Sequence, residues 1–362
     1  MIKKILPAMI GVALVGGMSS AVADVTAMGH IDTSFTSSKD KNLSGDTLNN
    51  LNCTTCSFGF KGSEDLGNGL KAIFKIDFQY DTTERNADGS ITDRDQWIGL
   101  GSNWGQVRIG TISTTYKSTG SLLDPVYRTV LQGRDWGFQS NLHTGAGESA
   151  AQGRAENTIR YDSPTFSGFK VMGHYTVQTE TDADSKADSP WGVGGQWQGG
   201  GFLVFANYIT SDSDDNNKDN DAWKVGGRYG FDKFAIFGQY EGDGGAIANR
   251  FSADVAVDGS FSELDGVGDK SDTWFLGGTA TFGNNMLYAA YGQGGDKKGA
   301  IVTDSTDLAL VGEVVSSEYD SYEIVGVHSL SKRTKAYIGY GSQDFDKGDK
   351  RTAFALGMKH TF

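Results

Sequence analysis

The sequence is poor in proline, cysteine and basic residues. It contains 4 Pro and 2 Cys but 51 Gly among its 362 residues. So much glycine with so little proline fits neither collagen nor disordered low-complexity sequence, and it indicates many strands and turns. Lys and Arg number 32 against 45 Asp and Glu, which gives a net charge of −13. A chain this acidic repels a phosphate backbone, so a nucleic-acid partner is excluded.

The chain also lacks an apolar run long enough for a transmembrane helix, which needs about 20 residues. Its clearest apolar stretch, residues 5–18, follows the basic pair Lys3 and Lys4 and precedes Ala21-Val22-Ala23. This order is typical of a signal peptide cleaved after Ala23. The sequence therefore predicts a signal peptide at residues 1–23 and an exported domain at residues 24–362. A closed β-barrel is the other structure that can pair every backbone group within a membrane.

Alternating side chains support a barrel. In residues 70–80 apolar side chains take every second position, and Lys71, Lys75, Asp77 and Gln79 lie between them. Residues 351–362 alternate in the same way, and such a period of two indicates strands with one apolar face. Sixteen strands are predicted, near residues 25–36, 56–62, 69–80, 93–101, 105–112, 156–163, 168–179, 191–198, 201–210, 222–230, 233–241, 273–282, 285–294, 318–329, 333–342 and 351–362.

The connections between these strands alternate strictly between short turns and long polar loops. A barrel threaded through a membrane has this rhythm, whereas a soluble sandwich has no reason for it. The three prolines of the exported domain, Pro125, Pro164 and Pro190, all lie in the connections. Aromatic residues gather near strand ends, as membrane-interface girdles do. The predicted fold is an all-β, antiparallel transmembrane barrel of sixteen strands.

Four stretches of the sequence resemble the general porins of Gram-negative bacteria. Residues 58–72 read FGFKGSEDLGNGLKA and resemble the family's second strand, first turn and third strand. Residues 154–157, 161–164 and Gly168 resemble the strand that leaves the constriction loop, and residues 329–334 with Tyr337 resemble the penultimate turn. The terminal Phe362 resembles the family's assembly signal. The resemblance implies a trimeric, non-enzymatic diffusion channel of the outer membrane without a cofactor, surrounded by lipopolysaccharide and lipid and inserted by the barrel-insertion machinery.

The longest connection, residues 113–155, is predicted to be the constriction loop. The resemblance implies that it folds into the lumen after strand five, and its apolar residues indicate packing against the inner wall. Its acids Asp124, Asp135 and Glu148 would then face basic residues of the wall. Opposed charges of this kind select solutes by their polarity. Strand parity assigns five basic residues to that wall: Lys61, Lys75, Arg108, Arg154 and Arg160.

Three further features leave alternatives open. Arg94 shares the parity of Ile98 and Leu100, so without a bulge it would face lipid. Cys53 and Cys56 are a possible disulfide, predicted to lie in the first outer loop, and no metal site is predicted. Ser57 and Thr111 stand where many relatives carry arginine. With the acidic outer loops, this thinner basic cluster predicts weak selectivity for cations, although salt screens the outer charges.

Three other functions compete with a passive channel for ions and small hydrophilic solutes. A substrate-selective channel would share the same barrel and differ only in what the constriction displays. An outer-membrane enzyme would need a nucleophile or acid–base set, and the five scattered histidines form none that the sequence reveals. An enzyme or an adhesin is therefore the weaker alternative.

Overall fold

The computed structural model describes residues 23–40, 47–84, 91–144, 146–147, 153–177, 189–210, 221–249, 271–294, 318–345 and 350–362. Nearly all of the predicted signal peptide, Glu148 and much of the long acidic connections lie outside these residues. No helix in the described part of the chain is long and apolar enough to span a membrane.

Strands dominate the described structure. They are β1 (Asp24–Asp40), β2 (Thr47–Cys53), β3 (Ser57–Gly67), β4 (Leu70–Gln79), β5 (Thr92–Ser102), β6 (Gly105–Ser113), β7 (Ala146–Gly147), β8 (Arg154–Asp162), β9 (Phe169–Thr176), β10 (Trp191–Gly199), β11 (Phe202–Thr210), β12 (Asp221–Phe231), β13 (Phe234–Gly244), β14 (Thr273–Phe282), β15 (Asn285–Gly294), β16 (Tyr319–Ser329), β17 (Thr334–Phe345) and β18 (Lys350–Thr361). Two short helices accompany them, α1 (Thr115–Gly120) and α2 (Ala246–Asn249).

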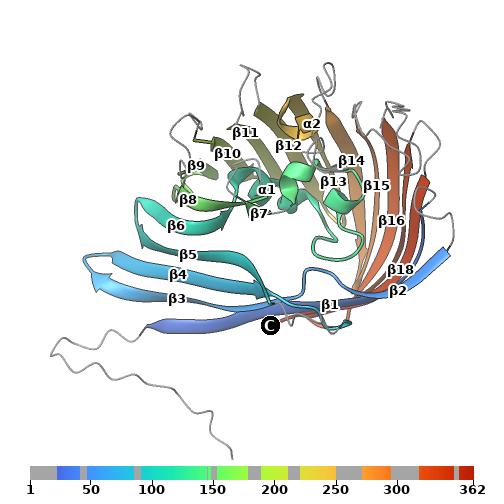
Figure 1. Ribbon diagram of the computed structural model, residues 1–362, viewed down its shortest axis with the longest axis horizontal. Coiled ribbons are helices and arrows are strands. Elements are labelled where there is room, and N and C mark those ends of the chain that lie inside the picture. Colours follow the sequence, from blue (N-terminus) through green and yellow to red (C-terminus); the bar gives the residue numbers. More distant parts are fainter. Residues whose placement is uncertain are drawn as a thin grey trace, which may run out of the picture.

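These 18 strands build a closed wall of sixteen. β2 and β3 pair with successive halves of β1 and together act as one wall strand. The two-residue β7 pairs parallel with β8 and adds no wall strand. All wall neighbours are antiparallel, and β1 closes the ring against β18 from His30↔Thr361 to Asp40↔Arg351. Figure 1 shows the strands running round this ring, with α1 inside it. The predicted antiparallel barrel of sixteen strands is confirmed.

Side chains alternate between the two faces of the wall as the sequence predicts. On β4, Ile76 is exposed on the outer face while its neighbour Asp77 is buried on the inner one. On β18, Phe354, Leu356 and Met358 are exposed, whereas Ala355, which lies between Phe354 and Leu356, is buried. An outer surface made of such apolar side chains suits the hydrocarbon of a membrane.

Aromatic pairs form two rows across the wall strands. Near the short turns, Phe202 stacks on Tyr229 and Phe231 contacts Phe234. Near the opposite ends, three pairs repeat between neighbouring strands: Trp191–Tyr208, Trp223–Tyr240 and Trp274–Tyr291. The Tyr and Trp rings have one polar edge and one apolar body, so such rows belong at the two interfaces of a bilayer.

The segment between β6 and β8 folds inside the ring. It contains α1 and three 3-10 turns, η1 (Ser121–Leu123), η2 (Gly133–Asp135) and η3 (Asn141–His143). The Thr114 side chain caps α1 by accepting from the Lys117 N–H at 3.3 Å. The described part of this connection, residues 114–144, is called the inner segment; it is too long to be a turn and too apolar to stay in water, so it packs on the wall.

Its apolar side chains share a core with the inner faces of β11 and β13 to β18. The inner segment contributes Leu123, Val126, Leu131, Trp136 and Phe138 to this core, and the wall contributes Phe205, Phe237, Phe275, Tyr288, Ala290, Val325, Val327, Tyr337, Ala353 and Ala355. Wall glycines leave the necessary space. A Cβ at Gly339 would lie 2.6 Å from Leu131, and one at Gly341 would lie 2.9 Å from Trp136.

Polar contacts anchor both ends of the inner segment. Lys224 on β12 donates to the Tyr116 carbonyl at 2.5 Å and contacts His143 Nε2 at 2.9 Å. Glu241 on β13 accepts from the Tyr116 hydroxyl and the Ser140 N–H, both at 2.9 Å. Lys359 on β18 donates to the Tyr127 carbonyl at 2.5 Å. The inner segment is therefore fixed to one half of the wall along most of its length.

Replacing Leu131 by Ala should loosen the inner segment. Leu131 is 0% exposed in the shared core, and such a truncation costs about 2–5 kcal/mol because it removes burial and leaves a cavity. We expect a lower free energy of unfolding in lipid vesicles and larger fluctuations of the single-channel current. Leu122→Ala is the matched control, since Leu122 lies in the same segment and is 44% exposed. Equal effects of the two substitutions would show that this core does not hold the segment.

Candidate pore-lining site

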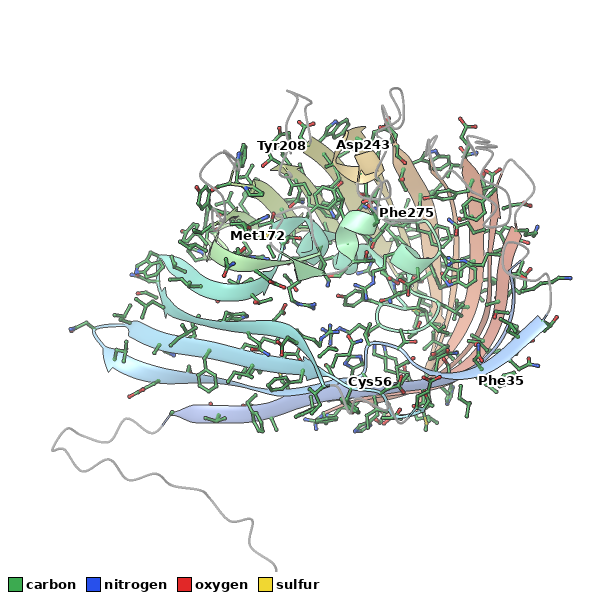
Figure 2. All side chains as sticks on the ribbon, in the orientation of Figure 1. Phe35, Cys56, Met172, Tyr208, Asp243 and Phe275 are labelled. Carbon is green, nitrogen blue, oxygen red and sulfur yellow. A yellow bond between two sulfur atoms is a disulfide. The ribbon has the colours of Figure 1, made fainter. Side chains whose placement is uncertain are left out.

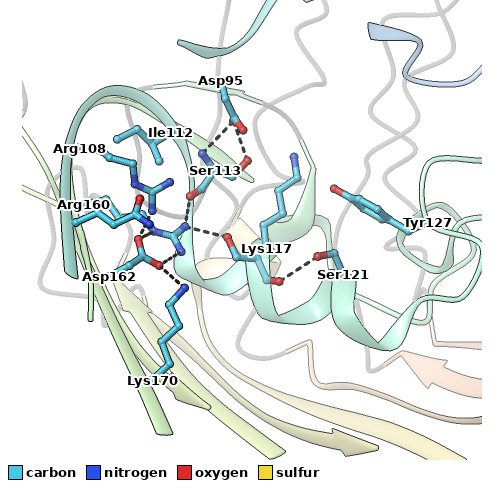
Figure 3. A pocket seen from close by; sticks show the side chains of 12 residues that line it. Asp95, Arg108, Ile112, Ser113, Lys117, Ser121, Tyr127, Arg160, Asp162 and Lys170 are labelled. Atoms are coloured by element: carbon cyan, nitrogen blue, oxygen red, sulfur yellow. Dashed lines mark hydrogen bonds and ion pairs between the residues drawn. The ribbon is translucent and has the colours of Figure 1, made fainter. Parts of the chain in front are cut away.

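A cluster of basic side chains lies on the inner faces of β4 to β6, β8 and β9, away from the strands that form the shared apolar core. Its first group surrounds Asp162 at the end of β8. Arg108 from β6 pairs with Asp162, Arg160 Nη2 lies 2.9 Å from Asp162 Oδ1, and Lys170 Nζ from β9 lies 3.1 Å from the same oxygen. Three cations thus share one carboxylate (Figure 3).

The second group depends on a bulge in β5. The register steps from Ile76↔Gln96 to Phe78↔Asp93, so Arg94 and Asp95 both lie opposite Asp77. A bulge of this kind lets two successive side chains reach the same face. Arg94 Nε lies 3.3 Å from Asp77, while Asp95 contacts Lys75 and Arg154, both at 2.8 Å. Arg94 therefore faces the lumen, and parity without the bulge would have placed it toward lipid.

Six basic side chains share three carboxylates in these two groups. Asp162 is paired with Arg108, Arg160 and Lys170, and Asp77 and Asp95 are paired with Lys75, Arg94 and Arg154. Each carboxylate fixes the direction of its cations, and the cations remain in excess. This part of the lumen is therefore positively charged.

The inner segment adds further cations beside this cluster. Lys117 on α1 lines two cavities, one of 330 Å³ with Arg108 and Arg160 and one of 380 Å³ with Arg94 and Arg154. Arg134 on η2 lines the larger cavity and donates to the His143 carbonyl at 3.1 Å. Arg128 approaches His30 Nδ1 on β1 at 3.2 Å.

Four of the five basic wall residues predicted from parity come together here: Lys75, Arg108, Arg154 and Arg160. Lys61 lies directly across the β3–β4 ladder from Lys75, is exposed and lines neither cavity. Strand parity did not assign Arg94 to the lumen, because the bulge in β5 reverses the alternation of side chains at that position. Lys117 and Arg134 lie on a short helix and a 3-10 turn, where no strand alternation exists to show which way a side chain points.

The predicted acids of the inner segment have different surroundings. Both carboxylate oxygens of Asp124 accept from backbone of the same segment, from Val126 N–H at 3.0 Å and from Gly133 N–H at 2.9 Å. Desolvation raises the pKa of Asp124 to about 6, although these N–H bonds favour its charged form. Asp135 accepts from Gln132 at 2.7 Å and lies 3.8 Å from Arg134. Glu148 lies outside the described residues.

Cys53 and Cys56 are joined by a disulfide. The pair lies in the wall between β2 and β3, where Figure 2 places Cys56 beside β1, and the predicted location in an outer loop is wrong. The reason is the length of β1, which pairs with β2 through Lys39 and so extends the wall past the cysteines. Cys56 is buried, and its sulfur accepts from the Asp32 N–H at 3.3 Å.

The disulfide staples an extra residue into the second wall strand. Thr33 pairs with Cys53 and His30 with Ser57, so two residues of β1 face three of the partner strand. Thr54 N–H donates to the Asp32 carbonyl at 3.1 Å, and Thr55 has a φ of 51°. The resulting stapled turn, Thr54 and Thr55, lines the 380 Å³ cavity.

Replacing both cysteines by serine should destabilise the barrel modestly. The disulfide joins residues three positions apart, and loop-closure entropy gives such a short loop about 2 kcal/mol. Urea unfolding of the protein in lipid vesicles measures the loss. Wild-type protein refolded with reductant should lose the same amount, and the double variant should not respond to reductant. A wild-type stability independent of reductant would contradict the prediction.

Comparison with known proteins agrees with this architecture. The family model described as "Gram-negative porin" matches residues 8–348. The major outer membrane protein P.IB of Neisseria meningitidis serogroup B is 26% identical over 95% of this chain and 96% of its own.

Two solved structures share the fold. The anion-selective porin from Comamonas acidovorans has a TM-score of 0.71 at 23% identity, covering 94% of this chain and 100% of its own. OmpT of Vibrio cholerae in its trimer form has a TM-score of 0.61 at 13% identity, covering 94% of this chain and 99% of its own. With the closed barrel and its charged lumen, these matches show that the chain belongs to the Gram-negative porins, which are channel proteins of the outer membrane and not enzymes.

Proposed function

We propose that this porin is a passive channel for ions and small hydrophilic solutes. We further propose that the constriction between the inner segment and the basic wall residues favours anions. A barrel of sixteen strands leaves an aqueous lumen, whereas one of eight is filled by side chains. The observation that carries the anion preference is the sharing of three wall carboxylates by six basic side chains. Positive charge close to the permeating ion lowers the barrier for anions.

The inner segment supports the same preference. Lys117 and Arg134 face the wall cluster, and the nearby acid Asp135 lies beside Arg134. The sequence instead predicts weak selectivity for cations, because Ser57 and Thr111 stand where many relatives carry arginine and because the outer loops are acidic. Arg94 on the bulge and Lys117 on α1 supply basic groups in the same lumen. The charge of the outer loops acts through water and is screened beyond about 8 Å at physiological salt.

Selectivity can be tested by reversal potentials in a KCl gradient across planar bilayers. We expect the wild type to prefer chloride at high salt and the preference to weaken at low salt. Arg154→Gln should reduce it about threefold, because a unit charge about 6 Å from the ion contributes about 0.7 kcal/mol in water. Lys332→Gln is the control, since Lys332 lies exposed in the turn before β17. A cation preference at all salt concentrations would contradict the proposal.

A substrate-selective channel is the alternative function. The two cavities beside Lys117 are specific observations in its favour, because each is lined by polar groups of fixed position. Conductance that follows solute size and charge alone would support the general channel. Saturation by one class of solute would support the selective one.

The assembly proposed for this porin is a homotrimer in lipopolysaccharide and outer-membrane lipid. The trimer form described for one structural neighbour supports it, and closed threefold symmetry buries the same surface on every subunit. Phe362 is proposed to be the signal for the barrel-insertion machinery. Its backbone N–H donates to the Gly29 carbonyl at 3.0 Å, which holds the last residue against the first strand.

The trimer should survive in SDS. We expect unheated samples to migrate as trimers and heated samples as monomers, because a subunit interface of obligate size resists detergent. Light scattering in mild detergent provides the independent mass. A monomeric mass in mild detergent would contradict the proposed assembly.

A further inference from the structure

We propose that the 380 Å³ cavity between the inner segment and the wall is a binding site for an oxyanion, meaning a solute that carries a carboxylate or a phosphate. The proposal rests on the proposed function, because it names the class of solute that the channel would hold. The site is bounded by Lys117, Arg134, Arg94 and Arg154, together with the stapled turn.

Lys117 is the central observation. The side chain is 5% exposed, yet within the described part of the chain its ammonium forms no hydrogen bond and no ion pair. In Figure 3 it extends from α1 away from the Arg160–Asp162 pair, and no dashed line reaches its amine. Its amine borders both cavities, so a bound anion could pair with an ammonium that has no partner among the described residues.

The neighbouring charges make the site positive. Burial, with Arg154 and Arg134 nearby, holds the pKa of Lys117 well below its usual range, and Asp95 opposes this effect. The acid that lines the cavity is Asp135, and it already contacts Gln132 and Arg134. Three guanidinium groups and the Lys117 amine against one engaged carboxylate favour an anionic occupant over a cationic one.

The arginines keep donors for a ligand. Arg154 contacts Asp95 through Nε, and Arg94 contacts Asp77 through Nε and Gln79 through Nη1. A guanidinium carries five N–H groups in a planar fork, so each retains terminal donors beyond these contacts. Such forks match the paired oxygens of carboxylate and phosphate, which a spherical chloride cannot engage in the same way.

Neutral groups complete the lining. Thr54, Thr55 and Thr144 contribute hydroxyl groups, and Gln79 and Gln132 contribute amides. The stapled turn is held in place by the disulfide, so its hydroxyls do not depend on a mobile loop. A volume of 380 Å³ exceeds that of about ten waters at roughly 30 Å³ each, which is enough for a small oxyanion with part of its hydration shell.

The test measures single-channel chloride current at fixed KCl while inorganic phosphate or succinate is added. We expect a saturable reduction of the current with at least one of the two probes. Lys117→Gln should raise the half-blocking concentration at least about tenfold, because a charge-assisted hydrogen bond is lost. Lys117→Arg should retain most of the block. Phosphate-only block identifies a phosphate-type solute, and succinate-only block identifies a carboxylate solute.

Lys233→Gln is the matched control, because Lys233 lies exposed in the turn between β12 and β13 and should shift the block less than about twofold. Heat-modifiable gel mobility verifies that every variant folds. A current that falls linearly with both probes, without saturation, would overturn the site. An unchanged half-blocking concentration in Lys117→Gln would overturn it as well.

Reversal potentials on the same channels separate this result from the proposed function. Chloride preference without saturable block would support the proposed anion selectivity and contradict the proposed binding site. Saturable block that depends on Lys117, in a channel without chloride preference, supports the site and contradicts the proposed selectivity.

Discussion

Backbone hydrogen bonding in a medium without water is the constraint on which this structure depends. Lipid cannot pair with the amides and carbonyls of a strand, so every strand in the bilayer needs two neighbours. The chain meets this requirement by pairing β1 with β18 over eleven positions, from His30↔Thr361 to Asp40↔Arg351. Closure separates an outer face, which must be apolar, from an inner face, which is free to vary. All functional chemistry of the protein follows from that freedom.

The inner face is divided into two halves with different tasks. The half formed by β11 and β13 to β18 carries apolar side chains and glycines, and it holds the inner segment through a shared core. The half formed by β4 to β6, β8 and β9 carries the ion-paired cations. Lys117 and Arg134 of the inner segment line a cavity together with Arg94 and Arg154 of the second half.

Shared carboxylates explain how so many cations can stand close together. Asp77, Asp95 and Asp162 lie between basic groups and reduce their mutual repulsion, while fixing the direction of each side chain. Two local irregularities of the wall make this arrangement possible. The β5 bulge turns Arg94 inward, and the disulfide between Cys53 and Cys56 holds Thr54 and Thr55 against the same cavity. Bulges of this kind commonly re-aim side chains beside functional sites.

The sequence by itself determined the barrel, its sixteen strands and the inward direction of Lys75, Arg108, Arg154 and Arg160. These features depend on a period of two and on the spacing of turns, both of which are local.

Only the tertiary structure decided the rest. Arg94 faces the lumen because one extra residue in β5 reverses the alternation, and parity cannot register an insertion that only strand pairing reveals. Cys53 and Cys56 lie in the wall because β1 continues past them. Lys117 points into a cavity because Tyr116 and His143 are fixed by Lys224 and Glu241, which lie about a hundred positions away in the chain. Such contacts arise from closure of the barrel, so no local pattern encodes them.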